Sequence, residues 1–406
     1  MSGAPAANRR TRSIPDSVLV VGASAAGLGT VEALRRGGYR GRLTVLGAEP
    51  HPPYDRPPLS KQILAGSWPA DRSHLRPPAA LSALDAEIIT GDPAVGLDTA
   101  PRTVHTAAGR TLTAEAIVVA TGLRPRTLPG QDGLAGVHVL RTLDDALALR
   151  ADLLRGSRIV VVGDGVLGAE IAATARGMGL PVTMTGPQPA PLAMQFGPLA
   201  AGLLADLHAE HGVELRLGAA ATGLTGRDGW VTGVCLENGR VLPADVVVVA
   251  FGAVPATDWL VGSGLPLDDG LVCDSRSRAA DGIYAAGDVA RWHHERLDVS
   301  LRLENRTNAT EQAVAVAATI LGDDRPYTPV PYHWTDQYDA RIQVHGILAP
   351  DAEVSVVDGS VADRRFVALY SRGGRTTGVL GWNMPKQARL RRREILGAAA
   401  LVEGAS

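Results

Sequence analysis

The chain has 406 residues, 47 of them glycine, with 4% aromatic residues, a net charge of −2 and a pI near 6.6. This length suffices for two or three domains, and the balanced charge argues against a nucleic-acid-binding protein. The longest apolar runs, such as Val246–Phe251, are too short to span a membrane. Cys235 and Cys273 cannot make a disulfide framework, so we interpret them as core residues of a cytoplasmic protein.

The N-terminal region predicts a strand, a glycine turn and a helix. Residues 1–13 are predicted to be a disordered tail, because the early arginines precede no apolar export segment. The strand Val18–Val21 then leads through a turn into a helix that ends at Arg36. In such a unit backbone N–H groups approach a pyrophosphate at the positive end of the helix. The predicted contacts here are Gly22, Ser24, Ala25 and Gly27.

A second strand, Leu43–Glu49, ends on an acid 22 residues after Gly27. This is near the spacing at which a carboxylate accepts the ribose hydroxyls of the first dinucleotide. We therefore predict that Glu49 binds ribose; the alternative is a solvated loop carboxylate.

The same unit recurs at Ile159–Arg176, and two copies predict two dinucleotides on one scaffold. Its turn supplies the predicted contacts Gly163, Gly165, Val166, Leu167 and Gly168. Each copy is followed by a buried strand that enters a turn, at Glu115–Arg126 and Asp245–Thr257. There we predict further contacts at Thr121, Gly122, Arg124 and Gly252. The sequence thus predicts an α/β protein with two Rossmann-like domains and a small α+β domain after residue 330.

Six strings together resemble the FAD-dependent ferredoxin reductases of the putidaredoxin reductase type, which supply electrons to haem-thiolate monooxygenases and ring dioxygenases: GASAAG, YDRPPLSK, ATGLRPR, GDGVLGAE, IYAAGDVA and HWTDQY. The resemblance extends from about Ser17 to Trp382. YDRPPLSK and WTDQY are more specific to it than either glycine turn. It implies a split FAD domain (14–125 and 253–329), an inserted NAD(P) domain (126–252) and a C-terminal domain (330–406).

The prolines of YDRPPLSK predict a stiff wall from which Arg56 and Lys61 project. A cation beside the flavin would stabilise negative charge that develops on the ring; the alternative for Lys61 is an exposed side chain. The resemblance implies that Lys61 pairs with Glu170. A buried Lys–Glu pair is costly, so contact between the two would support a functional role. Trp334 is expected near the flavin or as a core anchor.

Gly287 and Asp288 follow a predicted strand, and we expect Asp288 to begin a helix. Its carboxylate would accept hydrogen bonds from ribityl hydroxyls, cap that helix, or do both. We predict no metal site.

Two positions depart from the pattern of the resembling proteins. Gly186 stands where relatives usually end a strand on a glutamate that holds the NADH ribose and repels a 2′-phosphate. Arg306 stands where an aromatic residue is common, and it could stack, bind a carboxylate or 2′-phosphate, or be solvated. NADH is the expected donor, and because the usual glutamate is missing, NADPH is not excluded. Met184 and Met194, which flank the first departure, are predicted to pack.

The segment Tyr54–Gly66 lacks the Cys-x4-Cys pair of disulfide reductases, so electrons must leave singly to an external acceptor or oxygen. A locally cationic C-terminal domain could dock an acidic [2Fe–2S] ferredoxin, or simply present a solvated face. The basic residues that carry this expectation are Arg364, Arg365, Arg372, Arg375, Lys386, Arg389, Arg391, Arg392 and Arg393. The leading hypothesis is an NAD(P)H-dependent ferredoxin reductase, monomeric or weakly dimeric. The alternatives are an NAD(P)H oxidase or small-molecule reductase, and a binding flavoprotein with slow redox chemistry.

Overall fold

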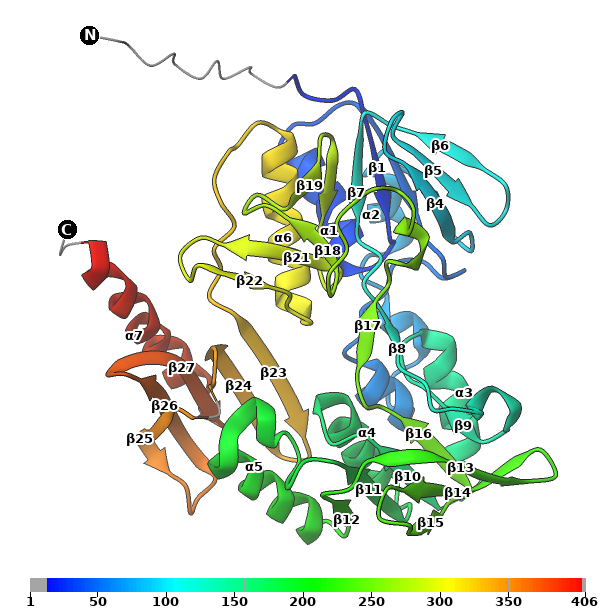
Figure 1. Cartoon of the computed structure of the whole chain (residues 1–406), viewed down its shortest axis with the longest axis vertical. Coiled ribbons are helices and arrows are strands. Elements are labelled where there is room, and N and C mark those ends of the chain that lie inside the picture. Colours follow the sequence, from blue (N-terminus) through cyan, green and yellow to red (C-terminus); the bar gives the residue numbers. More distant parts are fainter. Residues whose placement is uncertain (1–12, 157, 350, 404–406) are drawn as a thin grey trace.

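The computed structural model describes residues 13–156, 158–349 and 351–403, so the predicted tail lies almost wholly outside the described residues. Figure 1 shows three parts. The first (blue, cyan and yellow) lies above the second (green), and the third (orange to red) lies beside the second. The first part contains a mainly parallel sheet with helices, the second a parallel sheet with helices, and the third an antiparallel sheet with one helix. The predicted fold class is confirmed.

The first part is built on a sheet in the order β19, β20, β7, β1, β2, β3. These strands are β1 (Ser17–Val21), β2 (Arg42–Leu46), β3 (Glu87–Ile89), β7 (Ala116–Val119), β19 (Arg278–Ala280) and β20 (Ile283–Ala285). β20 pairs with β7 in parallel, so the chain returns to this sheet after the second part. Between β2 and β3 lie a π-helical turn η1 (Leu59–Ile63), a 3-10 turn η2 (Ala70–Ser73) and α2 (Pro78–Ser82).

Side chains that alternate along β1 are buried on opposite faces of this sheet. Val18 and Val20 pack with α1 (Ala25–Arg36) and α6 (Arg306–Ile320). Leu19 and Val21 pack with residues of two small three-stranded sheets on the other face. These are β4 (Ala94–Asp98), β5 (Thr103–Thr106) and β6 (Thr111–Thr113), and β18 (Leu271–Cys273), β21 (Ala290–His294) and β22 (Val299–Leu301).

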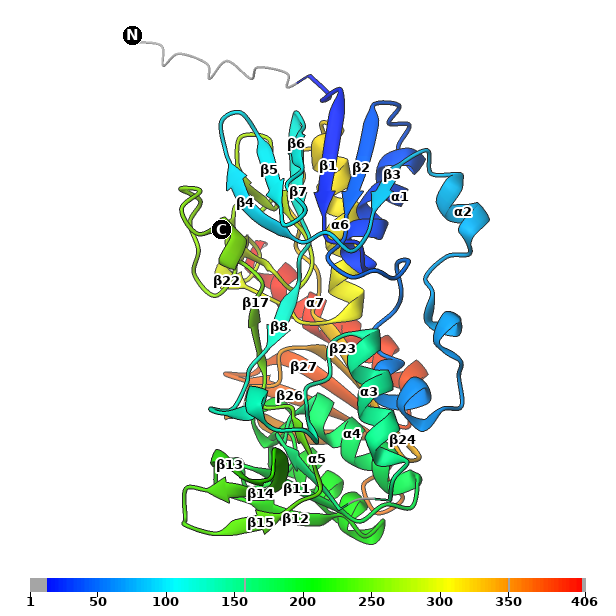
Figure 2. The same cartoon turned by 90° about the vertical axis from the view of Figure 1, so that its right-hand side faces the viewer.

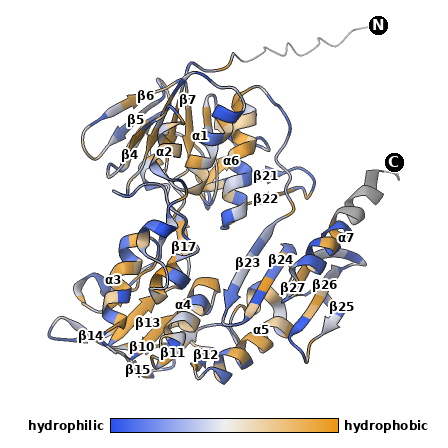
Figure 3. Cartoon of the chain, turned by 180° about the vertical axis from the view of Figure 1, so that it is seen from behind, coloured by the Kyte–Doolittle hydropathy of each residue, from blue (hydrophilic) through white to orange (hydrophobic). Residues whose placement is uncertain are grey.

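The second part repeats this plan with a fully parallel sheet in the order β12, β11, β10, β16, β9. Its strands are β9 (Val137–His138), β10 (Ile159–Val162), β11 (Val182–Gly186), β12 (Glu214–Leu217) and β16 (Val246–Val249). Its helices are α3 (Leu143–Leu153), α4 (Val166–Gly177) and α5 (Ala193–Glu210), and β13 (Ala221–Arg227), β14 (Trp230–Leu236) and β15 (Val241–Pro243) cover the other face. In Figure 3 the central strands are mostly hydrophobic.

The chain crosses between these two parts at β8 (Leu123–Pro125) and β17 (Ala253–Pro255), which pair antiparallel. Figure 2 shows this pair as the connection between the upper and lower parts. The predicted domain boundaries fall beside these strands, and the boundaries themselves stay a prediction. Short turns η3 (Gln131–Gly133) and η4 (Asp258–Leu260) follow the two crossings.

The third part is a sheet in the order β23, β24, β27, β26, β25, covered by α7 (Pro385–Glu403). Its strands are β23 (Tyr332–Gln337), β24 (Ala340–Gly346), β25 (Glu353–Ser360), β26 (Arg365–Arg372) and β27 (Arg375–Trp382). Tyr370 and Trp382 share one buried cluster with Phe196 and Leu204 of α5. The third part therefore packs on the second through a common core, although the chain enters β23 directly from the first part.

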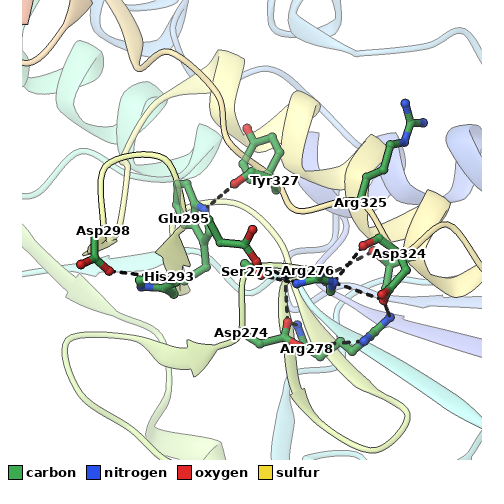
Figure 4. A network of polar contacts seen from close by, with 12 residues as sticks. Asp274, Ser275, Arg276, Arg278, His293, Glu295, Asp298, Asp324, Arg325 and Tyr327 are labelled. Carbon is green, nitrogen blue, oxygen red and sulfur yellow. Dashed lines mark hydrogen bonds and ion pairs between the residues drawn. The ribbon is translucent and has the colours of Figure 1, made fainter. Parts of the chain in front are cut away.

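A polar network holds the segment that leads from α6 to β23 (Figure 4). The Arg276 guanidinium lies 2.9 Å from the Glu295 carboxylate and 3.1 Å from that of Asp324. The buried Trp292 Nε1 donates to the carbonyl of Tyr327 at 3.1 Å. These contacts join β19, β21 and the segment, and so fix where the third part begins.

Two local predictions are wrong. Asp288 begins no helix, because Val289 and Ala290 are fully buried and the chain continues directly into β21, which pairs with β18. Met194 does not pack, since it is 64% exposed, whereas Met184 is buried as predicted. Cys273 is buried and Cys235 half-buried, and both are free thiols. Within the described residues no helix has the length and apolar character needed to cross a bilayer.

Candidate active site

Each glycine turn is closed by backbone contacts that leave no space for a side chain. A Cβ on Gly22 would lie 2.1 Å from the Ala120 carbonyl oxygen, and one on Gly27 would lie 1.7 Å from that of Gly22. In the second turn the corresponding distances are 2.3 Å for Gly163 and 2.1 Å for Gly168. Gly22 (φ +120°) and Gly163 (φ +138°) also adopt backbone conformations that favour glycine. The two turns therefore have equivalent backbone geometry, and a helix begins directly after each of them.

Gly165 differs from these glycines, because no protein atom lies within 4 Å of the place of its Cβ. It faces a cavity of about 1020 Å³ onto which both turns open. The predicted residues that line this cavity are Gly22, Ser24, Ala25, Glu49, Arg56, Lys61, Thr121, Gly122, Gly165, Val166, Leu167, Glu170, Gly252, Gly287, Asp288, Arg306 and Trp334. The structure thus brings together residues from all three parts of the chain.

Four predicted contact residues do not line the cavity. Gly27, Gly163 and Gly168 lie behind it and permit the close approach of strand and helix described above. Arg124 is not a lining residue either, although its guanidinium makes two hydrogen bonds, at 2.7 and 3.1 Å, with the carboxylate of Asp258, which lines the cavity. These four residues shape or flank the site without facing it.

Lys61 and Glu170 form a buried ion pair, with 2.6 Å between Lys61 Nζ and Glu170 Oε2. Lys61 lies in the π-helical turn η1, a distortion that is frequent at functional sites. Glu170 also accepts hydrogen bonds from Ser60 at 2.6 Å and from Thr335 at 2.8 Å. Three donors satisfy the carboxylate, which is the condition under which a buried ion pair can persist. Thr335 was not predicted from the sequence, although it lies within the quoted HWTDQY string.

Glu49 is not a solvated loop residue. Its carboxylate pairs with Arg56 at 2.7 Å and accepts a hydrogen bond from Tyr54. The hydroxyl of Tyr54 in turn accepts from the backbone N–H of Leu143 at 2.9 Å. This arrangement anchors the YDRPPLSK segment to the start of α3 and leaves Glu49 at the cavity wall.

Arg141 is a cavity residue that the sequence did not reveal. It lies just before the Thr142 capping box of α3, and its guanidinium is 3.5 Å from the Asp288 carboxylate. Among the described residues Arg141 Nε has no hydrogen-bond partner although it is buried. Burial raises the pKa of Asp288, and Arg141 opposes that rise. Only the fold brings Arg141 to Asp288, so no local pattern could have indicated it.

Arg306 is not a solvated residue at a helix start. As the first residue of α6 it pairs with Asp55 of the YDRPPLSK segment and donates to Thr310. Trp334 stands at the opposite wall, with its ring stacked on Tyr332 at a centroid distance of 5.9 Å. The departure at Arg306 therefore connects α6 to the wall segment.

The residues present fit two dinucleotides. The two turns offer N–H groups at helix N-termini, and Glu49 and Asp288 supply carboxylate acceptors. Arg141 also lines the cavity, and its buried Nε has no hydrogen-bond partner among the described residues. The free space beside Gly165 would allow a bound group to approach the backbone closely. No pair of cysteines is near, since neither Cys235 nor Cys273 lines the cavity.

Comparisons with known proteins agree with this geometry. Residues 16–313 match the family model of the pyridine nucleotide-disulphide oxidoreductases, and residues 332–404 match the reductase C-terminal model. Rhodocoxin reductase of Rhodococcus erythropolis is 35% identical over 372 residues, which cover 91% of this chain and 87% of that protein.

Two solved structures are also similar. A ferredoxin reductase from Rhodopseudomonas palustris superimposes with a TM-score of 0.87 at 35% identity, covering 91% of each chain. The reductase in a covalent putidaredoxin reductase–putidaredoxin complex gives a TM-score of 0.88 at 33% identity, covering 94% of this chain and 93% of that one. This chain therefore belongs to the pyridine nucleotide-disulphide oxidoreductase family and, within it, to the ferredoxin reductases that use FAD and NAD(P)H.

Proposed function

We propose that this protein passes electrons from NAD(P)H through FAD to a [2Fe–2S] ferredoxin that serves an oxygenase. One observation carries the proposal: the two glycine turns open onto a single cavity, so two bound dinucleotides would meet there. The solved complex with putidaredoxin supports a ferredoxin as partner. The lack of a cysteine pair at the cavity supports an external acceptor.

The first turn, Glu49, Arg56, Arg141 and Asp288 would hold FAD, and the second turn would hold the nicotinamide nucleotide. When bound, FAD accepts a hydride and releases electrons singly. Lys61 would place a positive charge beside the flavin, and Glu170, Ser60 and Thr335 would fix its position. Trp334 and Arg306 would close the cavity on two sides. This assignment matches the proposed domains 14–125 with 253–329 for FAD and 126–252 for NAD(P).

Anaerobic stopped-flow reduction tests this function. We expect the purified protein to retain FAD, to be bleached rapidly by a nicotinamide, and then to reduce a [2Fe–2S] ferredoxin faster than it reduces oxygen. Rapid turnover with oxygen and none with ferredoxin would instead identify an oxidase. A protein without flavin would contradict the proposal outright.

We further propose that ferredoxin docks on the exposed basic residues of α7, Lys386, Arg389, Arg392 and Arg393, which we term the α7 basic stripe. Three other basic residues of the third part are neutralised: Arg391 pairs with Asp358, Arg364 with Glu210 and Arg372 with Asp351. The pKa of His345 on β24 is lowered to about 4, mainly by burial and also by Arg392 and Arg389. Because α7 packs against β24, both guanidinium groups lie near that strand. Within the described part of the chain the stripe forms no salt bridge, and it lies close to the strand pair that carries Trp334.

Replacing two arginines of the stripe, in R389Q/R393Q, should lower kcat/KM for an acidic ferredoxin about 10-fold at low salt, because complementary charges accelerate association. The rate of reduction by NADH should not change. The matched control is R372Q/R375Q, which changes two arginines at the β26–β27 turn of the same part. Equal losses in both variants, or a loss that persists at high salt, would argue against docking on the stripe.

A further inference from the structure

We propose that Asp164 supplies the acid that Gly186 lacks: it binds the adenosine ribose hydroxyls of NADH and excludes the 2′-phosphate of NADPH. Asp164 lies inside the second glycine turn, immediately after Gly163. The inference deepens the function proposed above and rests on it, since it assumes that the second turn holds the nicotinamide nucleotide.

The position of the carboxylate explains the glycine at the strand end. β10 and β11 pair in parallel with Val162 opposite Thr185, so Asp164 and Gly186 follow these strands at the same edge of the sheet. A Cβ on Gly186 would lie 2.3 Å from Asp164 Oδ2 and 2.4 Å from its Cγ. The carboxylate thus already occupies the place where a strand-end side chain would start, and a glutamate at 186 would have to displace it from this position.

A set of hydrogen bonds fixes this carboxylate. The backbone N–H of Gln188 donates to Asp164 Oδ2, and the Gln188 side-chain amide donates to Oδ1, both at 2.7 Å. Gln188 Oε1 accepts from the backbone of Met194 at 2.7 Å, and the Asp164 carbonyl accepts from Leu192 at 2.8 Å. The loop between β11 and α5 is therefore built around Asp164, whose position is preorganised before any ligand binds.

The Asp164 carboxylate keeps acceptor capacity, and Asp164, although only 5% exposed, lines the cavity. A carboxylate has about four acceptor sites, and Gln188 uses two of them. Asp164 and Gln188 both line the cavity. Within residues 164–252, all of which the structure describes, no lysine or arginine lines it, and Arg216 on the adjacent strand is paired with Glu214. A ribose diol would find free acceptors, whereas a 2′-phosphate would meet a negative charge and no cation.

Calorimetric titration of the FAD-loaded protein with ADP-ribose and with 2′-phospho-ADP-ribose tests this role without relying on turnover. The unmodified protein should bind ADP-ribose more tightly than 2′-phospho-ADP-ribose. D164A should weaken ADP-ribose binding about 10- to 100-fold, because hydrogen bonds to a charged group are lost. D164N, which removes the charge with little change of shape, should tighten binding of the 2′-phosphorylated fragment about 10-fold.

A double variant separates this role from general damage to the loop. G186E alone should weaken ADP-ribose binding because the new side chain collides with Asp164. D164A/G186E moves the acid to the strand end and should bind ADP-ribose better than either single variant. The control is D228N, which removes a charge at the exposed β13–β14 turn of the same part and should change neither affinity.

Unchanged discrimination between the fragments in D164A and D164N would overturn the proposal, as would a double variant no better than its parents. Reduction of the flavin by NADH in stopped flow reports separately on the function. If neither nicotinamide reduces the protein, the proposed function fails. If NADH reduces it and Asp164 variants discriminate normally, only the inference about Asp164 fails.

Discussion

Replacing Lys61 by methionine should slow reduction of the flavin by NADH about 10²-fold, the size of effect seen when a preorganised stabilising group is removed from an active site. Lys61 faces the cavity and is held 2.6 Å from Glu170, so its charge is placed before the reaction begins. Methionine retains the length of the side chain and loses only the ammonium group. Anaerobic stopped-flow absorbance with saturating NADH measures the effect directly.

The Glu170 partner allows the electrostatic effect to be separated from folding. E170Q leaves a buried ammonium group without its counter-charge and should lower the free energy of unfolding by about 3 to 5 kcal/mol. K61M/E170Q removes both charges and should recover much of that stability while the reduction rate stays low. Recovery of the rate together with the stability would show that Lys61 acts only structurally.

The composition supplies a matched control for this experiment. Lysine occurs only at positions 61 and 386 among the 40 basic Lys and Arg residues of the chain. K386M changes the exposed lysine of α7 and should leave both the stability and the reduction by NADH unchanged. A comparable loss in K386M would contradict the assigned role of Lys61.

Replacing Gly27 by alanine should yield a protein that does not retain FAD. The added Cβ would lie 1.7 Å from the carbonyl oxygen of Gly22, which is backbone and cannot rotate away. Either the turn opens and the helix N-terminus moves from the diphosphate site, or the protein is destabilised by about 1 to 3 kcal/mol, the usual cost of overpacking. Flavin content after gel filtration and thermal unfolding measure the two effects.

Gly29, which lies in the same helix as Gly27, provides the control. A Cβ there would lie 3.3 Å from Ala313 Cβ, a tight contact that a shift of a few tenths of an ångström relieves. G29A also gains helix propensity of roughly 1 kcal/mol, which offsets the cost of packing. We expect G29A to bind FAD normally. A G27A protein that is yellow and as stable as G29A would refute the assigned role of the first turn.

Local patterns predicted the repeated units well, because their determinants lie close together in the chain. Two fully apolar strands, Val18–Val21 and Ile159–Val162, are each followed within a few residues by glycines. The tight turn requires glycine at these positions because a side chain would collide with the backbone. The wrong helix at Asp288 has the same origin. A glycine followed by an aspartate after a strand is typical of a helix start. Here Val289 and Ala290 are buried instead, and the chain continues as β21, which pairs with β18.

Charge patterns were less informative about the C-terminal domain. The sequence groups nine basic residues there, but distant acids such as Glu210 neutralise several of them. The unneutralised α7 basic stripe became visible only after these partners had been placed. Ion pairs between residues far apart in the sequence leave no periodic pattern, because the position of a charged residue on a helix does not reveal which distant residue it contacts.

The amino-acid sequence by itself determined the two glycine turns, the cysteine-free wall segment and the resemblance to ferredoxin reductases, because these depend on residues close together along the chain. Only the tertiary structure decided that Arg141 faces Asp288, that Thr335 donates to Glu170, and that Asp164 fills the space beside Gly186. Each of these contacts joins strands or helices far apart in sequence. Their geometry follows from the parallel register of the sheets and the packing of three parts around one cavity, which no local pattern encodes.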